Sequence, residues 1–469
     1  MKLRKIIALC AAVALLLSSM AIVASASANQ PTFTIGNPYA NVDWDSFGQY
    51  KTQLHVHSSA SDGEYTIREL VELHYELGYD ILAITDHATV GVPWDQAPRI
   101  VPYLRLLQVL GIIGINNPRD VLTSERRQEI LDGIGRDGRG MLEITGGIEH
   151  KGVAILAESH VNSFWAGDYG QGMIGINGDF RTPIAEVHRR GGISFINHPG
   201  RITGAQDMTA AQAQEFYALD SFWASRFAAL FLDFDSLVGV EVIGKDDRET
   251  HNDRILYDTL LQLLIPHGVT PWLFTNSDGH RTGEFDRAFT VHLLEEKTEA
   301  NLRHSMENGE FFSVARYAWP EFGDRYGRRD GNHPQVSRIS VNETTYTITI
   351  EADYYDNVVW VSNGVEIATG TTLNLANYSD EIGVYVRAYL TGPGGILYVQ
   401  PFTVLRAGQT WEELQQPIVE PRAFADTLRT TVDVFEFVFG WFPPTRWLTY
   451  LVTQFDFVQS LPWLHNLFN

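Results

Sequence analysis

The segment "QLHVHSSASDG" at residues 53–63 places two histidines two positions apart, within and after a run of β-forming residues. In a strand, residues i and i+2 project from the same face, so the rings of His55 and His57 are predicted to lie side by side. Two neutral imidazoles that converge in this way form half of a metal site and would make a poor core. A complete site then requires further ligands from elsewhere in the chain.

Seven more residues of metal-binding types stand at the ends of predicted strands or in the loops that follow. They are Asp62, His87, Glu149, His160, His198, Asp278 and His280. A single histidine is more often a surface or core residue than a ligand, but nine suitable residues at strand ends indicate a site. The only cysteine is Cys10, near the N-terminus. Imidazole and carboxylate ligands without thiolate suit Zn, Mn or Fe(II).

Between about residues 50 and 315, β-forming runs alternate with segments of helical spacing. The predicted strands are "YKTQLHVHS", "DILAITDH", "LEITGGIEH", "GISFINHP", "GVEVIG" and "PWLFTNSDGH". The predicted helices include "TIRELVELHYELG", "PIAEVHRRGG" and "HNDRILYDTLLQLLIPHG". This alternation predicts βα units around a parallel sheet or barrel, in which the C-terminal strand ends carry the chemistry. Residues 88–141, with the helical piece "TSERRQEILDGIG", are interpreted as an inserted lid or subdomain.

The stretches "LHVHSSASDG", "ILAITDH", "GGIEH", "INHPG" and "TNSDGH" resemble, in type and order, the motifs of the PHP (polymerase and histidinol phosphatase) superfamily. The resemblance implies an α/β fold, a distorted (β/α)7 TIM-like barrel, with three divalent metal ions per chain. It implies one ion held by His55, His57, Glu149 and Asp278, a second held by Glu149, His160 and His198, and a third held by Asp62, His87 and His280.

Three other residues are predicted to act beside these ligands. Asp86 is expected to orient His87 by accepting a hydrogen bond from its ring, or else to be a turn carboxylate. Arg201 is expected to contact a substrate phosphate through its guanidinium, or else to be a surface charge. Glu241, on the predicted buried strand "GVEVIG", is expected to have a polar role near the site, or else to face water at a strand end.

The chain divides into four predicted parts. Residues 1–28 combine the basic start "MKLRK", the apolar run "IIALCAAVALLL" and the small-residue site "ASA", a pattern typical of a secretory signal peptide. The alternative is an uncleaved N-terminal anchor. Residues 29–325 form the PHP-like barrel, and residues 330–408 alternate like a small Ig-like β-sandwich. Residues 409–469 are predicted to be a helical, aromatic-rich tail that docks on the body, or alternatively contacts a membrane interface or a partner.

Charge and hydropathy limit the expected partners. The chain carries a formal net charge of −22, which repels long polyanions, so no long nucleic acid is expected. A small phosphorylated substrate is expected, because bound cations reverse the field locally. No transmembrane span is expected in the mature chain, since its aromatic tail never reaches 18 uninterrupted apolar residues. The predicted location is secreted or extracytoplasmic, in the periplasm or at the cell surface, and the C-terminal domain is expected to contact the envelope or another surface.

The resemblance implies a metal-dependent phosphoesterase that hydrolyses small phosphomonoesters or short phosphodiesters with a metal-activated hydroxide, and the pattern of residues 1–28 adds the expectation that it is exported. A carboxylate shared by two ions places them roughly 3.5–4 Å apart, the spacing used in phosphoryl transfer. One alternative is a metal-dependent amidohydrolase, which the absence of an obvious bridging lysine disfavours. Another is a non-catalytic surface or glycan-binding protein, which the presence of all nine predicted ligands disfavours.

Overall fold

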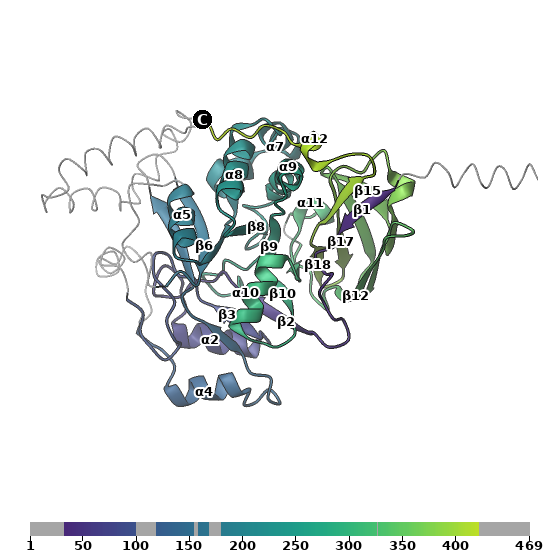
Figure 1. Cartoon of the computed structure of the whole chain (residues 1–469). Coiled ribbons are helices and arrows are strands. Elements are labelled where there is room, and N and C mark those ends of the chain that lie inside the picture. The colour runs from purple at the N-terminus through teal and green to yellow at the C-terminus, as the bar shows by residue number, and fades with distance from the viewer. Residues whose placement is uncertain (1–31, 100–118, 154–157, 168–179, 326, 422–469) are drawn as a thin grey trace, which may run out of the picture.

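The computed structural model describes residues 32–99, 119–153, 158–167, 180–325 and 327–421 (Figure 1). The predicted signal peptide lies outside the described residues. So do residues 100–118 of the predicted insertion and residues 422–469 of the predicted tail.

Among the described residues, eleven strands precede residue 320. They are β1 (Phe33–Gly36), β2 (Gly48–Gln53), β3 (Ile81–Ala83), β4 (Leu142–Ile144), β5 (Ile148–Val153), β6 (Glu158–Phe164), β7 (Ile193–Ile196), β8 (Leu237–Ile243), β9 (Trp272–Thr275), β10 (Ala288–Leu294) and β11 (Phe311–Ala315). The C-terminal strands are β12 (Gln335–Asn342), β13 (Thr347–Asp353), β14 (Asn357–Ser362), β15 (Val365–Thr369), β16 (Thr372–Asn374), β17 (Tyr385–Gly392), β18 (Gly395–Val399) and β19 (Phe402–Arg406).

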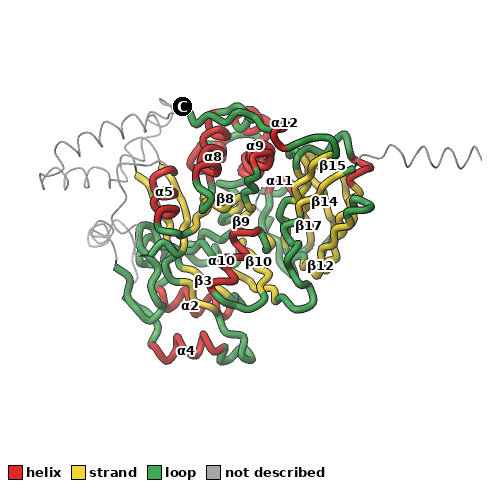
Figure 2. The backbone as a smooth tube through the Cα atoms, in the orientation of Figure 1, coloured by secondary structure: helices red, strands yellow, loops and turns green. Residues whose placement is uncertain are grey.

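All but the last of the described α-helices lie in the first region of the chain. They are α2 (Ile67–Glu76), α4 (Ser124–Asp132), α5 (Arg181–Arg189), α6 (Pro199–Thr203), α7 (Ala210–Phe216), α8 (Phe222–Asp233), α9 (Asp253–Leu264), α10 (Glu299–Asn308), α11 (Trp319–Phe322) and α12 (Trp411–Leu414). Figure 2 shows α8 and α9 together above β8, with α2 and α4 on the opposite side of the molecule.

The helices predicted from sequence spacing are confirmed as α2, α4, α5 and α9. Their ends follow local signals. Thr66 caps α2 by accepting a hydrogen bond from the Glu69 amide, and the Glu69 side chain accepts one from the Thr66 amide in return. Helix α4, which lies in the described part of the predicted insertion, is tied to α2 through Arg126 and Glu72.

The mixed α/β class is confirmed, but strand pairing does not close a (β/α)7 barrel among the described residues. Strands β2, β3 and β4 run parallel at one end of a large sheet, and β7, β8 and β9 run parallel in a five-stranded sheet. The two sheets are linked by the isolated bridges Val56↔Gly279 and His87↔Glu149. The physical reason is that β5, β6 and β7 pair antiparallel, which interrupts the βα repeat.

The C-terminal β region shares a sheet with the first region. The large sheet has eleven strands, in the order β1-β19-β17-β18-β11-β10-β2-β3-β4, with β14 and β15 attached through β17. Strand β11 pairs antiparallel with β18, and β1 from the N-terminal side pairs with β19. The second layer of the C-terminal region is the three-stranded sheet β12-β13-β16.

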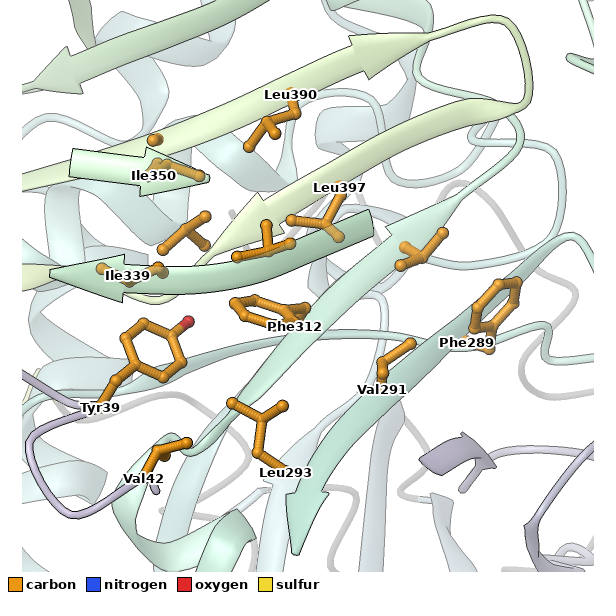
Figure 3. Packing of buried hydrophobic residues seen from close by; sticks show 14 of the residues in the cluster. Tyr39, Val42, Phe289, Val291, Leu293, Phe312, Ile339, Ile350, Leu390 and Leu397 are labelled. Atoms are coloured by element: carbon orange, nitrogen blue, oxygen red, sulfur yellow. The ribbon is translucent and has the colours of Figure 1, made fainter. Parts of the chain in front are cut away.

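One hydrophobic core runs across the predicted boundary near residues 325–330. Figure 3 shows Phe312 and Val291 of the first region packed in the same cluster as Leu397 and Ile339 of the C-terminal region. A buried ion pair adds a polar link, because Arg387 on β17 donates to both oxygens of Asp258 on α9, at 2.7 and 2.6 Å. The two regions are therefore joined by hydrogen bonds, apolar packing and charge.

Within the described ranges, no helix combines the length and the apolar character needed to cross a bilayer.

Candidate metal centre

All nine predicted ligands meet in one cluster. His55 and His57 follow β2, Asp62 lies in the next loop, His87 follows β3, Glu149 and His160 lie in β5 and β6, His198 follows β7, and Asp278 and His280 follow β9. Seven of the nine side chains are buried, and Asp62 and His280 are partly exposed. The nine side chains therefore converge, as expected from the sequence. That they bind metal ions stays a prediction.

The first group contains both histidines of the opening motif. His57 Nε2 lies 3.1 Å from Glu149 Oε2 and 3.2 Å from Asp278 Oδ1. His55 Nε2 lies 3.4 Å from each of the same two oxygens. The rings stand side by side as predicted, with 3.2 Å between their Nε2 atoms, although regular pairing of β2 ends at Gln53. Four donor atoms thus face one small volume.

Glu149 turns its second oxygen to a different pair of histidines. Its Oε1 lies 2.9 Å from His160 Nδ1 and 3.4 Å from His198 Nε2. Glu149 and His160 share a sheet face because Glu149 is opposite Asn162 across the β5–β6 ladder, and His160 is two residues from Asn162. One carboxylate therefore serves two donor groups, as a bridging ligand would.

The third group lies nearest to solvent. Asp62 Oδ2 lies 3.4 Å from His87 Nε2, and Asp62 Oδ1 lies 3.4 Å from His280 Nε2. His87 Nδ1 is also 2.8 Å from Glu149 Oε2, so this ring stands between the groups. The turn that carries Asp62 needs a glycine next to it, because a Cβ on Gly63 would lie 2.3 Å from the His57 carbonyl oxygen.

Glu241 orients His55 from the side opposite the cluster. His55 Nδ1 donates to Glu241 Oε2 at 2.9 Å, and Asn276 donates to the same oxygen at 2.9 Å. A carboxylate at Nδ1 favours the tautomer whose Nε2 lone pair points into the cluster. Glu241 is fully buried in β8. The polar contact that it makes near the site is the hydrogen bond from the His55 ring.

Glu241→Gln is expected to weaken metal binding by roughly 10–100-fold, because a neutral amide no longer fixes the protonation of His55. Chelator competition on the full chain measures the change. Glu307→Gln, an exposed substitution of the same type on α10, is the matched control and is expected to bind metal like the wild type. Equal affinities in the two variants would contradict the orienting role.

Asp86 acts on a loop rather than on His87, which corrects the expectation from sequence. Its two oxygens accept hydrogen bonds from the Ser58 amide at 2.7 Å and from the Ser58 and Ser61 hydroxyls, each at 2.6 Å. Ser61 Oγ in turn lies 3.4 Å from His57 Nδ1. Asp86 points away from the neighbouring imidazole because the turn after His57 offers three donors at once.

Arg201 lies on α6 at the edge of the cluster. Its Nε is 4.0 Å from Glu249 Oε2, in the loop between β8 and α9, and its side chain is one-third exposed. The distance to Glu249 places Arg201 beside the loop that lines the site entrance. A contact with substrate stays a prediction.

Sequence reasoning missed three residues that hold or face the ligands. Asn197 donates to Glu149 Oε1 at 2.8 Å and to Asn162 at 2.9 Å, and Asn276 supports Glu241 as described. Lys245 Nζ lies 3.1 Å from Asp278 Oδ2. Asn197 and Asn276 fall inside the quoted motifs "INHPG" and "TNSDGH", and Lys245 follows "GVEVIG" directly. The sequence signal that could have identified these three residues was their position at the end of a strand.

The cluster keeps its carboxylates ionised. Burial alone would raise the pKa of Glu149, but the rings of His160, His87 and His55 hold that pKa well below its usual value. Burial likewise opposes ionisation of Asp278, and the charges of Lys245 and His55 hold its pKa well below the usual value. Ionised carboxylates are the form that binds cations.

The donor set fits divalent metal ions. Four overlapping groups of His, Asp and Glu each bring their donor atoms within 4.8 Å of one another. Both ring nitrogens of His198 are buried and make no hydrogen bond within the described part of the chain, which is unusual unless another ligand completes them. Imidazole and carboxylate donors suit Zn, Mn or Fe, and the identity and number of ions stay predictions.

A cleft of about 520 Å³ opens beside the third group. Its lining consists of Asp62, Glu64, Lys245, Asp246, Arg248, Glu249, His280, Arg281, Thr282, Glu284 and Arg287. Asp62 and His280 belong to both the cleft and the ligand cluster. The cleft therefore offers a polar molecule a route to the ligand cluster.

Residues 53–209 match the family model described as the PHP domain. Among curated proteins, the DNA polymerase/3′-5′ exonuclease PolX of Bacillus subtilis is 44% identical over 48 residues, a match that covers 10% of this chain and 8% of that protein. The chain thus matches only a small part of that relative's length.

Several solved structures are similar to this chain at low identity. A two-domain protein from Bacteroides vulgatus, with a predicted PHP-like metal-dependent phosphoesterase, is 17% identical, with 80% of this chain and 90% of that chain covered and a TM-score of 0.38. An amidohydrolase from Chromobacterium violaceum is 18% identical, with 50% and 88% covered and a TM-score of 0.26. A lesion-specific endonuclease from Pyrococcus furiosus is 10% identical, with 55% and 56% covered and a TM-score of 0.29. Likenesses this distant do not bear on substrate.

Proposed function

We propose that this chain, whose residues 53–209 match the PHP domain, is a metal-dependent hydrolase of phosphoesters that acts on small phosphomonoesters or short phosphodiesters. The observation that carries the proposal is the shared position of Glu149, with one oxygen facing His55 and His57 and the other facing His160 and His198. Such sharing is what a multinuclear site for phosphoryl transfer requires.

The charges of the ligand cluster decide when an anionic substrate can bind. Three ionised carboxylates, Asp62, Glu149 and Asp278, would repel a phosphoryl group, so this cluster favours a phosphoester only when cations occupy it. Divalent ions held there would supply Lewis-acid charge and a nucleophilic water of lowered pKa. Glu241 keeps His55 in the correct tautomer, and Asp86 holds the turn that follows His57.

The volume and the polar lining of the cleft favour a small, polar substrate. Its volume of about 520 Å³ falls within the range of small-molecule sites. Recognition of unpaired nucleobases uses aromatic stacking surfaces, and the residues that line this cleft in the described part of the chain are all charged or polar. The net charge of −22 adds a repulsive field against long nucleic acids.

The proposed place of action is outside the cytoplasm. The support is the pattern of residues 1–28, with a basic start, an apolar run and a small-residue cleavage site. Contact of the C-terminal β region with an envelope or other surface is part of the same proposal. Fractionation of cells, combined with N-terminal sequencing, tests it, and an intact N-terminus on a cytoplasmic protein would contradict it.

Hydrolysis assays on the metal-loaded protein test the proposed activity. The substrates are p-nitrophenyl phosphate, bis-p-nitrophenyl phosphate and an N-acetylated amide. Turnover of a phosphate ester that chelation abolishes and added Mn²⁺ or Zn²⁺ restores is the expected result. Amide turnover alone would replace the proposal with the amidohydrolase alternative. Tight metal binding without hydrolysis, together with glycan binding, would replace it with the surface-binding alternative.

A further inference from the structure

We propose that Lys245 is a substrate-binding residue of this site, and that its ammonium group donates a hydrogen bond to a non-bridging oxygen of the substrate's phosphoryl group. The proposal rests on the proposed function, because it assigns a residue to the same phosphoester. It adds a protein-borne positive charge to a site whose predicted ligands are histidines and carboxylates.

Position is the first argument. Lys245 follows β8 after a single glycine, and its Nζ lies 3.1 Å from Asp278 Oδ2. The other oxygen of Asp278 faces His55 and His57 at 3.4 and 3.2 Å, so the ammonium stands directly across this carboxylate from the first ligand group. An ammonium has three N–H donors. Asp278 uses one of them, and Glu249 Oε2 lies farther away, at 3.9 Å. Lys245 also lines the cleft, so a remaining donor can meet a ligand.

Burial, taken together with the acid that each side chain meets, is the second argument, because the two separate Lys245 from the other cations of the cleft. Arg287 has an exposed fraction of 17%, but it pairs with Asp246 at 3.7 Å, outside the ligand groups. Arg281 and Arg248 have exposed fractions of 67% and 55% and pair with Glu284 and Asp246. The Lys245 side chain has an exposed fraction of 22%. A charge partly removed from water interacts more strongly with a nearby anion than one in bulk solvent does. Lys245 is therefore the cleft cation best placed to hold a phosphoryl oxygen beside the ligand cluster.

Backbone conformation is the third argument. Lys245 has a φ of +48°, and two of the predicted ligands, His198 and Asp278, have φ values of +27° and +43°. Residues other than glycine adopt this left-handed region at an energetic cost, and such residues concentrate at functional sites. Lys245 thus shares its left-handed backbone conformation with two of the predicted ligands, His198 and Asp278.

A buried charge network holds the loop that presents Lys245. Asp247, itself at φ +60°, is fully buried and accepts two hydrogen bonds of 2.7 Å from Arg254. Arg254 also donates to Glu321 at 2.9 Å, and Glu321 accepts a hydrogen bond of 2.8 Å from Tyr398 on β18. The C-terminal β region thereby reaches, through three polar contacts, the loop that carries the proposed substrate-binding residue.

The rival explanation is that Lys245 only neutralises Asp278. Such a counter-ion would affect metal retention, whereas a substrate-binding residue affects the affinity for phosphate at full metal occupancy. Inorganic phosphate is therefore the probe, used as a competitive inhibitor at saturating Mn²⁺ or Zn²⁺. The variants of the full chain are Lys245→Met, Lys245→Arg and, as a surface control of equal charge change, Arg303→Met on α10.

With metal content equal by elemental analysis, Lys245→Met is expected to lower kcat/KM for p-nitrophenyl phosphate by about 10²-fold, the loss typical of one charge-stabilising donor. The inhibition constant for phosphate is expected to rise about tenfold, with partial recovery in Lys245→Arg and no change in Arg303→Met. Wild-type values in Lys245→Met, or values restored simply by saturating metal, would overturn the proposal. A wild type without phosphoesterase activity would instead refute the proposed function, and calorimetry with phosphate would then decide whether Lys245 binds anions.

Discussion

Glu149→Gln is expected to abolish hydrolysis of phosphate esters and to lower the number of tightly bound metal ions. The expected fall in kcat/KM exceeds about 10³-fold, which corresponds to about 4 kcal/mol of transition-state stabilisation. Glu149 is fully buried, and each of its oxygens faces a different group of histidines. Glutamine has nearly the same shape but is neutral and keeps a single oxygen, so it cannot serve both groups. Elemental analysis and steady-state kinetics measure the two effects.

A carboxylate on β4, the strand that precedes β5 along the chain, provides the control for this experiment. Glu143 on β4 pairs with Arg127 and lies outside the ligand groups, so Glu143→Gln is expected to keep its metal and its activity. Circular dichroism shows whether both variants are folded. A folded Glu149→Gln protein with wild-type metal content and turnover would contradict the shared role of this carboxylate and, with it, the basis of the proposed function.

Arg387→Met is expected to lower the free energy of unfolding by about 3–5 kcal/mol, because it leaves the carboxylate of Asp258 buried without its counter-ion. Arg387 and Asp258 each have an exposed fraction of 5%, and Asp258 keeps the neutral Tyr385 hydroxyl as a donor after the substitution. Urea denaturation followed by circular dichroism measures the loss. The effect tests whether the C-terminal β region and α9 are one energetic unit.

Two further variants make this result specific. Arg303→Met breaks a pair with Glu307 whose side chains have exposed fractions of 36% and 39%, and it is expected to cost less than about 1 kcal/mol. The double variant Asp258→Asn with Arg387→Met is expected to recover part of the loss, since no charge is left buried alone. An unfolding midpoint equal to wild type in Arg387→Met would show that the ion pair does not stabilise the junction.

The local parts of this molecule were readable from the sequence. The pairing of the His55 and His57 rings follows from the alternation of side chains along extended backbone, which involves neighbouring residues alone. The start of α2 follows from the Thr66 and Glu69 capping pattern, and its length from apolar spacing. The candidate ligands could be named because their types are unusual at strand ends.

Only the tertiary structure decided which distant groups meet. The antiparallel β6 interrupts the expected barrel, Asp86 bonds to Ser58 and not to the adjacent His87, and Lys245 meets Asp278. In the same way β18 joins β11 and carries the C-terminal region into the main sheet. Periodicity and composition record the preferences of neighbouring residues. Contacts between segments far apart depend instead on how whole sheets and helices pack, which no short stretch of sequence encodes.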